Sequence, residues 1–135
     1  IVKELLTQPV IGSKGTATYC KIAGMDVSAK TGTTDENYDR WLCGFTPYYT
    51  AATWYGFDEN ETIESNMKNP AGLLWSSVMT TIHSGLKGAT YEKPSSVYSY
   101  TICEDTGKRA TKSCKNTYTE YFLEATVPEE CTGIH

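Results

Sequence analysis

An ammonium, two hydroxyls and a glycine stand side by side in the segment 27–34, whose sequence is VSAKTGTT. Lys30 brings a positive charge, and Thr31 and Thr33 bring hydroxyl groups that donate or accept hydrogen bonds. Gly32 adds no Cβ, so a bound molecule can approach the backbone closely there. Charged and hydroxyl donors in one place suit an anion such as a peptide carboxylate. The segment therefore predicts a site for an anionic peptide.

The strand that must carry these groups is predicted from the apolar residues before Lys30 and the charged turn at 35–37. Taken alone, a Lys-Thr-Gly-Thr run is more often a solvated strand end or a turn. Because side chains alternate along a strand, Lys30 and Thr31 cannot both face a cleft over one face of a sheet. A groove beside an edge strand also meets backbone N–H and C=O groups, which can bind an extended peptide and aim an N–H at its carbonyl. We therefore expect 27–34 to be an edge strand.

Further strands are predicted at 40–46 and 50–57, which are rich in Trp, Tyr, Phe and Thr and are joined by a short turn. Together with 27–34 they form an antiparallel meander. Alternation at 97–103 is typical of a strand, and a hydrophobic run at 118–123 completes a small tail unit with it. The fold class that follows is α+β, with an antiparallel sheet and a flanking helix.

The flanking helix is predicted to begin at Asn69-Pro70, a capping residue followed by a proline in the first helical position. It should run to about His83, which we interpret as a helix-end residue rather than a metal ligand. The apolar stripe expected to pack on the sheet consists of Leu74, Val78 and either Thr81 or Ile82, joined by Trp75 and Met79. Shorter helical segments are expected at 1–6 and 16–20.

The order of motifs after Lys30 resembles that of one enzyme family. The runs DRW at 39–41, GFTP at 44–47 and WYGFD at 54–58 follow the Lys-Thr-Gly-Thr run at close spacing. This arrangement resembles the third box and the next two strands of the transpeptidase domain of penicillin-binding proteins. The resemblance covers nearly the whole chain. The tail is similar to the end of the bifunctional, class A branch at Asp105-Thr106-Gly107, Ala110-Thr111, Cys114, Glu120-Tyr121-Phe122-Leu123, Pro128, Cys131 and His135.

The resemblance implies that residues 1–90 are the C-terminal portion of a transpeptidase domain and that 91–135 form a Cys-containing unit packed on it. In the family a serine attacks the carbonyl between the two terminal D-alanines of a peptidoglycan stem peptide, and β-lactams acylate the same serine. Lys30 would orient the second box's serine and attract the substrate carboxylate. Thr31 and Thr33 would bind that carboxylate along the backbone at Gly32, and the Thr33 N–H would form half of the oxyanion hole.

The nucleophile itself is expected outside this chain. The family's Ser-x-x-Lys and Ser-x-Asn boxes precede the Lys-Thr-Gly box, and no Ser-x-Asn occurs here. Two Ser-x-x-Lys matches, at Ser65 and Ser84, follow that box, and we reject both as the nucleophile. This chain would then supply one wall of the site and be inactive alone.

The partners implied are the stem peptide, β-lactams, and either the missing N-terminal half of the domain or a second copy paired through the open edge at 50–57. The resemblance also places the parent on the extracytoplasmic face of the bacterial membrane, held by an N-terminal anchor absent here. A net charge of −4 and a sequence pI near 5.1 argue against nucleic acid, and no cofactor is expected. Two alternatives stay open, namely a non-catalytic extracellular peptide- or protein-binding module and a β-lactamase fragment.

The five cysteines do not predict a metal site from their spacing. No Cys-x-x-Cys occurs, and the two histidines, His83 and His135, lie far apart in the sequence. Cys103 and Cys114 bracket a turn-rich segment and could form a disulfide there. Cys20 and Cys43 stand among apolar residues and are expected to be buried.

Overall fold

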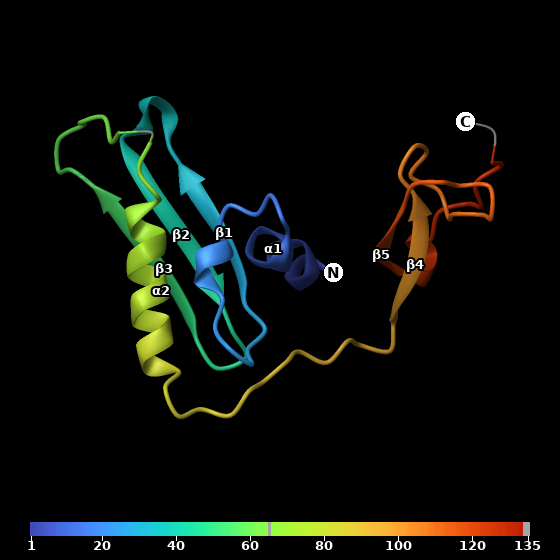
Figure 1. Ribbon diagram of the computed structural model, residues 1–135, viewed down its shortest axis with the longest axis horizontal. Coiled ribbons are helices and arrows are strands. Elements are labelled where there is room, and N and C mark those ends of the chain that lie inside the picture. The colour runs from blue at the N-terminus through green and yellow to red at the C-terminus, as the bar shows by residue number, and fades with distance from the viewer. Residues whose placement is uncertain (65, 134–135) are drawn as a thin grey trace. The chain divides into compact units, whose positions relative to one another are not determined.

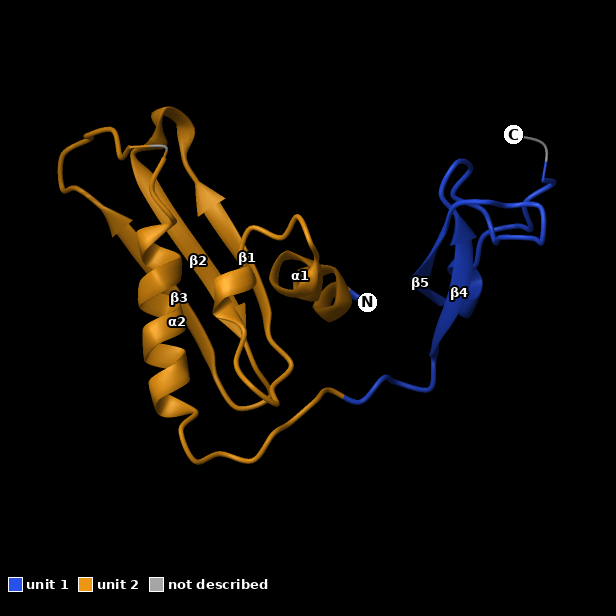
Figure 2. Ribbon diagram, in the orientation of Figure 1, with its two compact units in different colours: residues 1, 92–135 blue, residues 2–91 orange. Residues whose placement is uncertain are grey.

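The structure is a computed structural model that describes residues 1–64 and 66–133. It divides into two compact units, residues 2–91 and residues 92–135 together with Ile1 (Figure 2). Ser65 and His135, which bore on the nucleophile and metal predictions, lie outside the described residues.

The first unit contains a three-stranded antiparallel sheet in the order β1-β2-β3, so β1 and β3 are its edges. The helix α2 lies across β2 and β3, and α1 lies beside β1 (Figure 1). The α+β class, the meander and the edge position of the Lys-Thr-Gly strand are therefore confirmed. In chain order the elements are α1 (Val2–Ile11), η1 (Thr18–Cys20), β1 (Ser28–Thr33), η2 (Asp35–Asn37), β2 (Asp39–Phe45), β3 (Thr50–Gly56) and α2 (Pro70–Ile82).

The two N-terminal helical predictions were only partly right. The segment predicted at 1–6 extends as α1 to Ile11, with Pro9 inside the helix. The segment predicted at 16–20 is a single 3₁₀ turn, η1. In α1, Thr7 is buried and its hydroxyl lies 3.0 Å from that of Ser28, which ties the helix to the start of β1.

Helix α2 begins as its sequence predicts. The Asn69 side chain caps the helix by accepting a hydrogen bond from the Gly72 N–H at 3.3 Å, and its amide also donates to the Trp41 carbonyl at 2.9 Å. Pro70 is tolerated in the first turn because its missing N–H has no partner inside the helix there. The cap therefore both starts the helix and fixes its first turn against β2.

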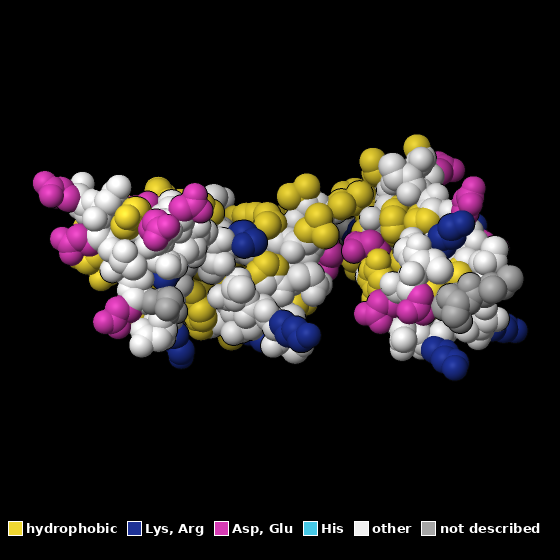
Figure 3. All heavy atoms as spheres, turned by 90° about the horizontal axis from the view of Figure 1, so that it is seen from above, with side chains coloured by type: hydrophobic (Ala, Val, Ile, Leu, Met, Phe, Trp, Pro, Cys, Tyr) yellow, Lys and Arg dark blue, Asp and Glu magenta, His cyan; other side chains and the backbone are white. Residues whose placement is uncertain are grey.

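The face of α2 that packs on the sheet is only partly the predicted one. Trp75 and Met79 are fully buried, and the Trp75 indole donates to the Ala51 carbonyl of β3 at 3.0 Å. The other predicted positions, Leu74, Val78 and Ile82, are 52%, 45% and 43% exposed. The apolar side chains span more of the helix circumference than the sheet can cover. Hydrophobic side chains accordingly remain visible on the surface of this unit (Figure 3).

The core of the first unit joins the sheet to both helices. Trp75 fits against Gly44, where a Cβ would lie 2.8 Å from the indole ring and 2.9 Å from the Ala29 Cβ. Glycine at this position of β2 therefore lets the indole pack close to the backbone. The buried cluster comprises Val10, Ala17, Cys20, Val27, Ala29, Leu42, Trp75 and Met79.

The second unit contains the antiparallel pair β4 (Val97–Cys103) and β5 (Thr117–Leu123). The alternation at 97–103 is confirmed as a strand, and the hydrophobic run at 118–123 is the strand paired with it. A one-turn helix, η3 (Glu124–Thr126), follows β5. The buried hydrophobic side chains of its described residues are few: Val97, Ile102, Cys103 and Cys131.

Candidate functional site

The backbone of β1 presents the Thr33 N–H to the open edge of the sheet. The Thr34 N–H donates to the Asp39 carbonyl of β2 at 3.3 Å. In an antiparallel ladder the residues that bond the partner strand alternate with residues whose N–H and C=O point away from it. Because Thr34 points toward β2, Thr33 and Thr31 point toward the outer edge.

Lys30 reaches the same edge. Its side chain is exposed, and its ammonium donates to the Thr31 carbonyl at 3.0 Å, which is one of the outward-pointing backbone groups. The Thr31 hydroxyl lies 3.0 Å from that of Thr16, in the loop before η1. Thr33 is exposed. The predicted site residues are thus neighbours along one strand edge, with a cation, two hydroxyls and an outward N–H.

Gly32 packs against the neighbouring strand. A Cβ at this position would lie 3.1 Å from the Trp41 Cβ, which faces it across the β1–β2 pair. Trp41 in turn contacts Trp54 of β3, with ring centroids 6.4 Å apart. Glycine at this position therefore lets the Trp41 side chain pack closely over β1, in addition to the substrate clearance predicted from the sequence.

Cys43 contradicts its predicted burial. It pairs with Lys30 across the β1–β2 ladder, and its side chain is exposed like that of its strand neighbour Trp41. The adjacent Leu42 points to the α2 side and is fully buried. The prediction for Cys43 was wrong because apolar neighbours in the sequence do not imply burial on a strand, where successive side chains face opposite sides of the sheet. Cys20, by contrast, is buried as predicted, and burial raises the pKa of its thiol to about 11.

The loops that lead into β1 are fixed by an ion pair. The Lys3 ammonium lies 3.1 Å from an Asp26 carboxylate oxygen, and that carboxylate also accepts the Tyr91 N–H at 3.0 Å. Partial burial raises the pKa of Asp26, but the Tyr91 and Lys3 hydrogen bonds outweigh burial and hold it below its ordinary value. Partial burial likewise lowers the pKa of Lys3, but Asp26 and Glu4 outweigh it and the net shift is upward.

His83 is the C-cap of α2, which confirms its prediction as a helix-end residue. Its Nδ1 lies 2.6 Å from the Met79 carbonyl and must carry the proton to donate to it. Nε2 lies 2.8 Å from the Thr46 hydroxyl. Both ring nitrogens of this buried side chain are therefore engaged within the fold. Ser84, the rejected nucleophile candidate, follows directly and is exposed.

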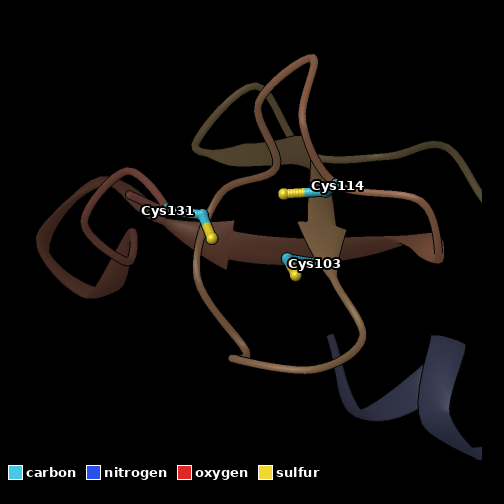
Figure 4. A group of neighbouring side chains, drawn as sticks. All are labelled: Cys103, Cys114 and Cys131. Atoms are coloured by element: carbon cyan, nitrogen blue, oxygen red, sulfur yellow. The ribbon is translucent and has the colours of Figure 1, made fainter. Parts of the chain in front are cut away.

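Three cysteines of the second unit come together, which the sequence spacing did not predict. The Sγ atoms of Cys103, Cys114 and Cys131 all lie within 4.8 Å of one another (Figure 4). Their thiols influence one another's protonation. Hydrogen bonds from the Thr106 hydroxyl, from backbone N–H groups and from Cys114 outweigh desolvation and lower the pKa of Cys103 to about 7. A Thr111 N–H lowers the pKa of Cys114, but desolvation and the two neighbouring thiols raise it overall.

Comparisons with known proteins bear on the family resemblance predicted from the sequence. Residues 93–135 match the family model described as "Penicillin-binding protein 1A, C-terminal domain". The whole chain aligns with penicillin-binding protein 1A of Clostridium botulinum at 33% identity over 141 residues, and with that of Clostridium tetani at 32% over 142 residues. Over its whole length the chain is similar to one part of penicillin-binding protein 1A. The predicted resemblance is thereby confirmed.

The chain spans less than a fifth of the length of the curated relatives described here. It covers 17% of the Clostridium botulinum protein and 15% of penicillin-binding protein 1A/1B of Bacillus subtilis, which is 31% identical over 137 residues and aligns with 84% of this chain. The fold is that of penicillin-binding protein 1A from Haemophilus influenzae, whose solved structure matches 93% of this chain at a TM-score of 0.74 and 23% identity and is itself covered over 20% of its length. Among the described residues, no helix is long and apolar enough to span a membrane.

Proposed function

We propose that this chain, as part of a penicillin-binding protein, supplies the Lys-Thr-Gly wall of a peptidoglycan transpeptidase site. The substrate is the D-alanyl-D-alanine end of a stem peptide, and β-lactams bind in the same place. A serine outside these 135 residues forms the acyl-enzyme, expels the terminal D-alanine and passes the acyl group to an amine of a neighbouring strand.

The single observation that carries this proposal is the direction of the Thr33 N–H. It points to the open edge of β1, because Thr34 bonds β2. An N–H held by a strand and aimed outward needs no rearrangement to meet a developing oxyanion. Removing one such donor costs about 10²–10³ in rate where it has been measured.

Lys30, Thr31 and Thr33 supply the charge and the hydroxyl groups. The Lys30 ammonium lies at the Thr31 carbonyl, so it is already on the side of the strand where a peptide would add. A substrate carboxylate would accept hydrogen bonds from the Thr31 and Thr33 hydroxyls and would be attracted by the ammonium. The ammonium would also stabilise and orient the serine of the second box.

The position of Ser84 supports a nucleophile on another segment. Its backbone N–H donates to the Thr81 carbonyl at 3.1 Å, so it belongs to the turn that ends α2. A transpeptidase nucleophile requires a base within hydrogen-bond reach and an adjacent oxyanion hole. The Ser84 backbone is used to terminate a helix, and the proposed oxyanion donor is on β1.

The test compares Lys30→Ala with Lys21→Ala in the full-length protein that carries this segment, with a fluorescent penicillin as the probe. We expect Lys30→Ala to slow acylation at least tenfold, since the ammonium is lost from the site. Lys21 is exposed in the loop after η1 and should leave the rate unchanged. Equal acylation rates in wild type and Lys30→Ala would refute the role of Lys30.

A second measurement locates the nucleophile. The 135-residue chain is incubated with penicillin and its mass is measured under denaturing conditions. We expect no adduct on this chain, because its only contribution is the wall of the site. A covalent adduct on it would place the nucleophile within these residues and overturn the proposed division of roles. That outcome would favour a site complete in itself.

A further inference from the structure

The cysteine cluster of the second unit is built from three stretches that are distant in the sequence. Cys103 ends β4, Cys114 lies in the loop before β5, and Cys131 comes after η3. Cys103 is fully buried, Cys131 is 4% exposed and Cys114 is half-buried. Their mutual Sγ separations, within 4.8 Å, suit ligands of one metal ion. Tetrahedral zinc with Zn–S bonds of about 2.3 Å places sulfur atoms about 3.8 Å apart.

Each sulfur also accepts hydrogen bonds from nearby backbone or hydroxyl groups. The Gly133 N–H donates to Cys131 Sγ at 3.4 Å, and the Thr111 N–H donates to Cys114 Sγ at 3.4 Å. Backbone N–H groups of Asp105 and Thr106 donate to Cys103. Donors of this kind stabilise thiolates and orient them toward a metal. The cluster is thus surrounded by groups that suit sulfur in its charged form.

Two glycines in the loops around the sulfurs adopt left-handed backbone conformations, which direct nearby N–H groups toward the sulfurs. Gly107 and Gly133 have φ values of +68° and +76°, which residues with a Cβ rarely adopt. A Cβ on Gly133 would also lie 2.9 Å from the Ser113 Cβ. Gly133 therefore lets the chain turn directly after Cys131, so that its own N–H returns to the sulfur.

The small apolar core of this unit gives the cluster a structural role. Apart from the cysteines, its described buried hydrophobic residues are Val97 and Ile102. A domain of this size rarely folds on so little apolar burial, and disulfides or metals commonly supply the missing stability. A link among three distant stretches would hold the β4–β5 pair to the loop and the C-terminal segment.

We propose that Cys103, Cys114 and Cys131 bind one structural Zn²⁺ as thiolates. Soft sulfur ligands select zinc among the common divalent ions, and binding releases the thiol protons to the solvent without any change of oxidation state. A fourth ligand completes the tetrahedron in such a set.

A disulfide between Cys103 and Cys114, as the sequence suggests, is the competing use of these residues. A disulfide joins two sulfurs about 2.05 Å apart and leaves the third without a role. The donors found around all three sulfurs favour a site that uses each of them equally. The two arrangements exclude one another, because a disulfide sulfur does not bind zinc as a thiolate.

The test measures zinc in the 135-residue chain, purified without chelators or added reductant, by elemental analysis and native mass spectrometry. We expect one zinc per chain in wild type and a loss of at least tenfold in Cys131→Ser. Cys43→Ser is the matched control, since Cys43 is exposed on the other unit and should leave the zinc content unchanged.

A second readout protects the test against misfolding of the variant. Cobalt(II) added to the zinc-free wild-type chain should give the intense near-ultraviolet absorption of thiolate-to-cobalt charge transfer, and zinc should then displace it. Wild type without zinc and without this absorption would overturn the proposal. A mass two daltons lower than that of the reduced chain, located at these cysteines, would overturn it in favour of the disulfide.

Discussion

In the first unit the residues that stabilise the fold are different from those proposed to bind substrate, whereas in the second unit the proposed ligands also form part of the core. In residues 2–91, buried side chains such as Trp75 and Leu42 hold the sheet together, while the groups proposed to bind substrate lie on the exposed edge of β1. In residues 92–135, the proposed ligand groups Cys103 and Cys131 are themselves among the few buried residues. A change at the strand edge can therefore alter chemistry alone, whereas a change in the cysteine cluster should alter both.

The largest effect is expected from the core of the first unit. Trp75→Ala should lower the free energy of unfolding of residues 2–91 by about 3–5 kcal/mol, because it leaves a cavity and removes the hydrogen bond to the Ala51 carbonyl. Urea unfolding followed by tryptophan fluorescence measures it. The remaining tryptophans, Trp41 and Trp54, both lie in this unit.

The metal content of the second unit is the control for that variant. If zinc binding falls together with the stability of the first unit, the two units do not hold their structures independently. Unchanged zinc content with a lowered unfolding midpoint would show that the second unit keeps its structure when the first is destabilised.

Replacing Thr33 with proline should lower the acylation rate without lowering the stability of the first unit. Thr33→Pro removes an N–H that points away from β2, and edge strands tolerate proline at such positions. We expect acylation by penicillin in the full-length protein to fall about 10²–10³-fold, the cost of one oxyanion donor. Thermal unfolding of the same variant should change little.

Thr34→Pro is the matched control, because the Thr34 N–H, just beyond the end of β1, donates to the Asp39 carbonyl of β2. Here the unfolding midpoint should fall, since the hydrogen bond that joins the end of β1 to β2 is lost. An unchanged acylation rate in Thr33→Pro would mean that the Thr33 N–H is not an oxyanion donor. A midpoint that falls equally in both variants would mean that the edge is structural as well.

The smallest effect is expected from the Lys3–Asp26 pair. The folded-state pKa of Asp26 lies below its ordinary value, so its stabilisation is present above about pH 4 and is lost as the pH falls through the folded-state pKa. Lys3, with a raised pKa, keeps its contribution until the pH rises past about 10. Since both side chains are partly exposed, the pair should contribute about 0.2–1 kcal/mol.

The comparison that isolates this contribution is wild type against Asp26→Asn, in urea at pH 6.5 and pH 2.5. The difference in unfolding free energy should be present at pH 6.5 and should shrink at pH 2.5. Asp58→Asn, in the exposed loop after β3, should show no such change. A difference that persists at pH 2.5 would mean that Asp26 acts through hydrogen bonding to Tyr91 rather than through its charge.

Most of the local elements, and the position of Lys30, Thr31 and Thr33 on an edge strand, could be predicted from the sequence alone. Strand alternation, the Asn69-Pro70 cap and the order of motifs after Lys30 depend on residues close together in the chain, and their hydrogen-bonding and conformational preferences act locally. The outward direction of the Thr33 N–H follows once β1 is known to be an edge with Thr34 bonded to β2.

Which face of α2 is buried, and which cysteines meet, depended on packing between segments that are distant in the chain. Leu74 and Trp75 are neighbours on a helix that is apolar on much of its surface, and burial was set by where the sheet contacts it. The three cysteines meet because the β4–β5 pairing and the return of the C-terminal segment close long loops. Burial and convergence depend on surfaces contributed by distant residues, and no local pattern records which surface a side chain will meet.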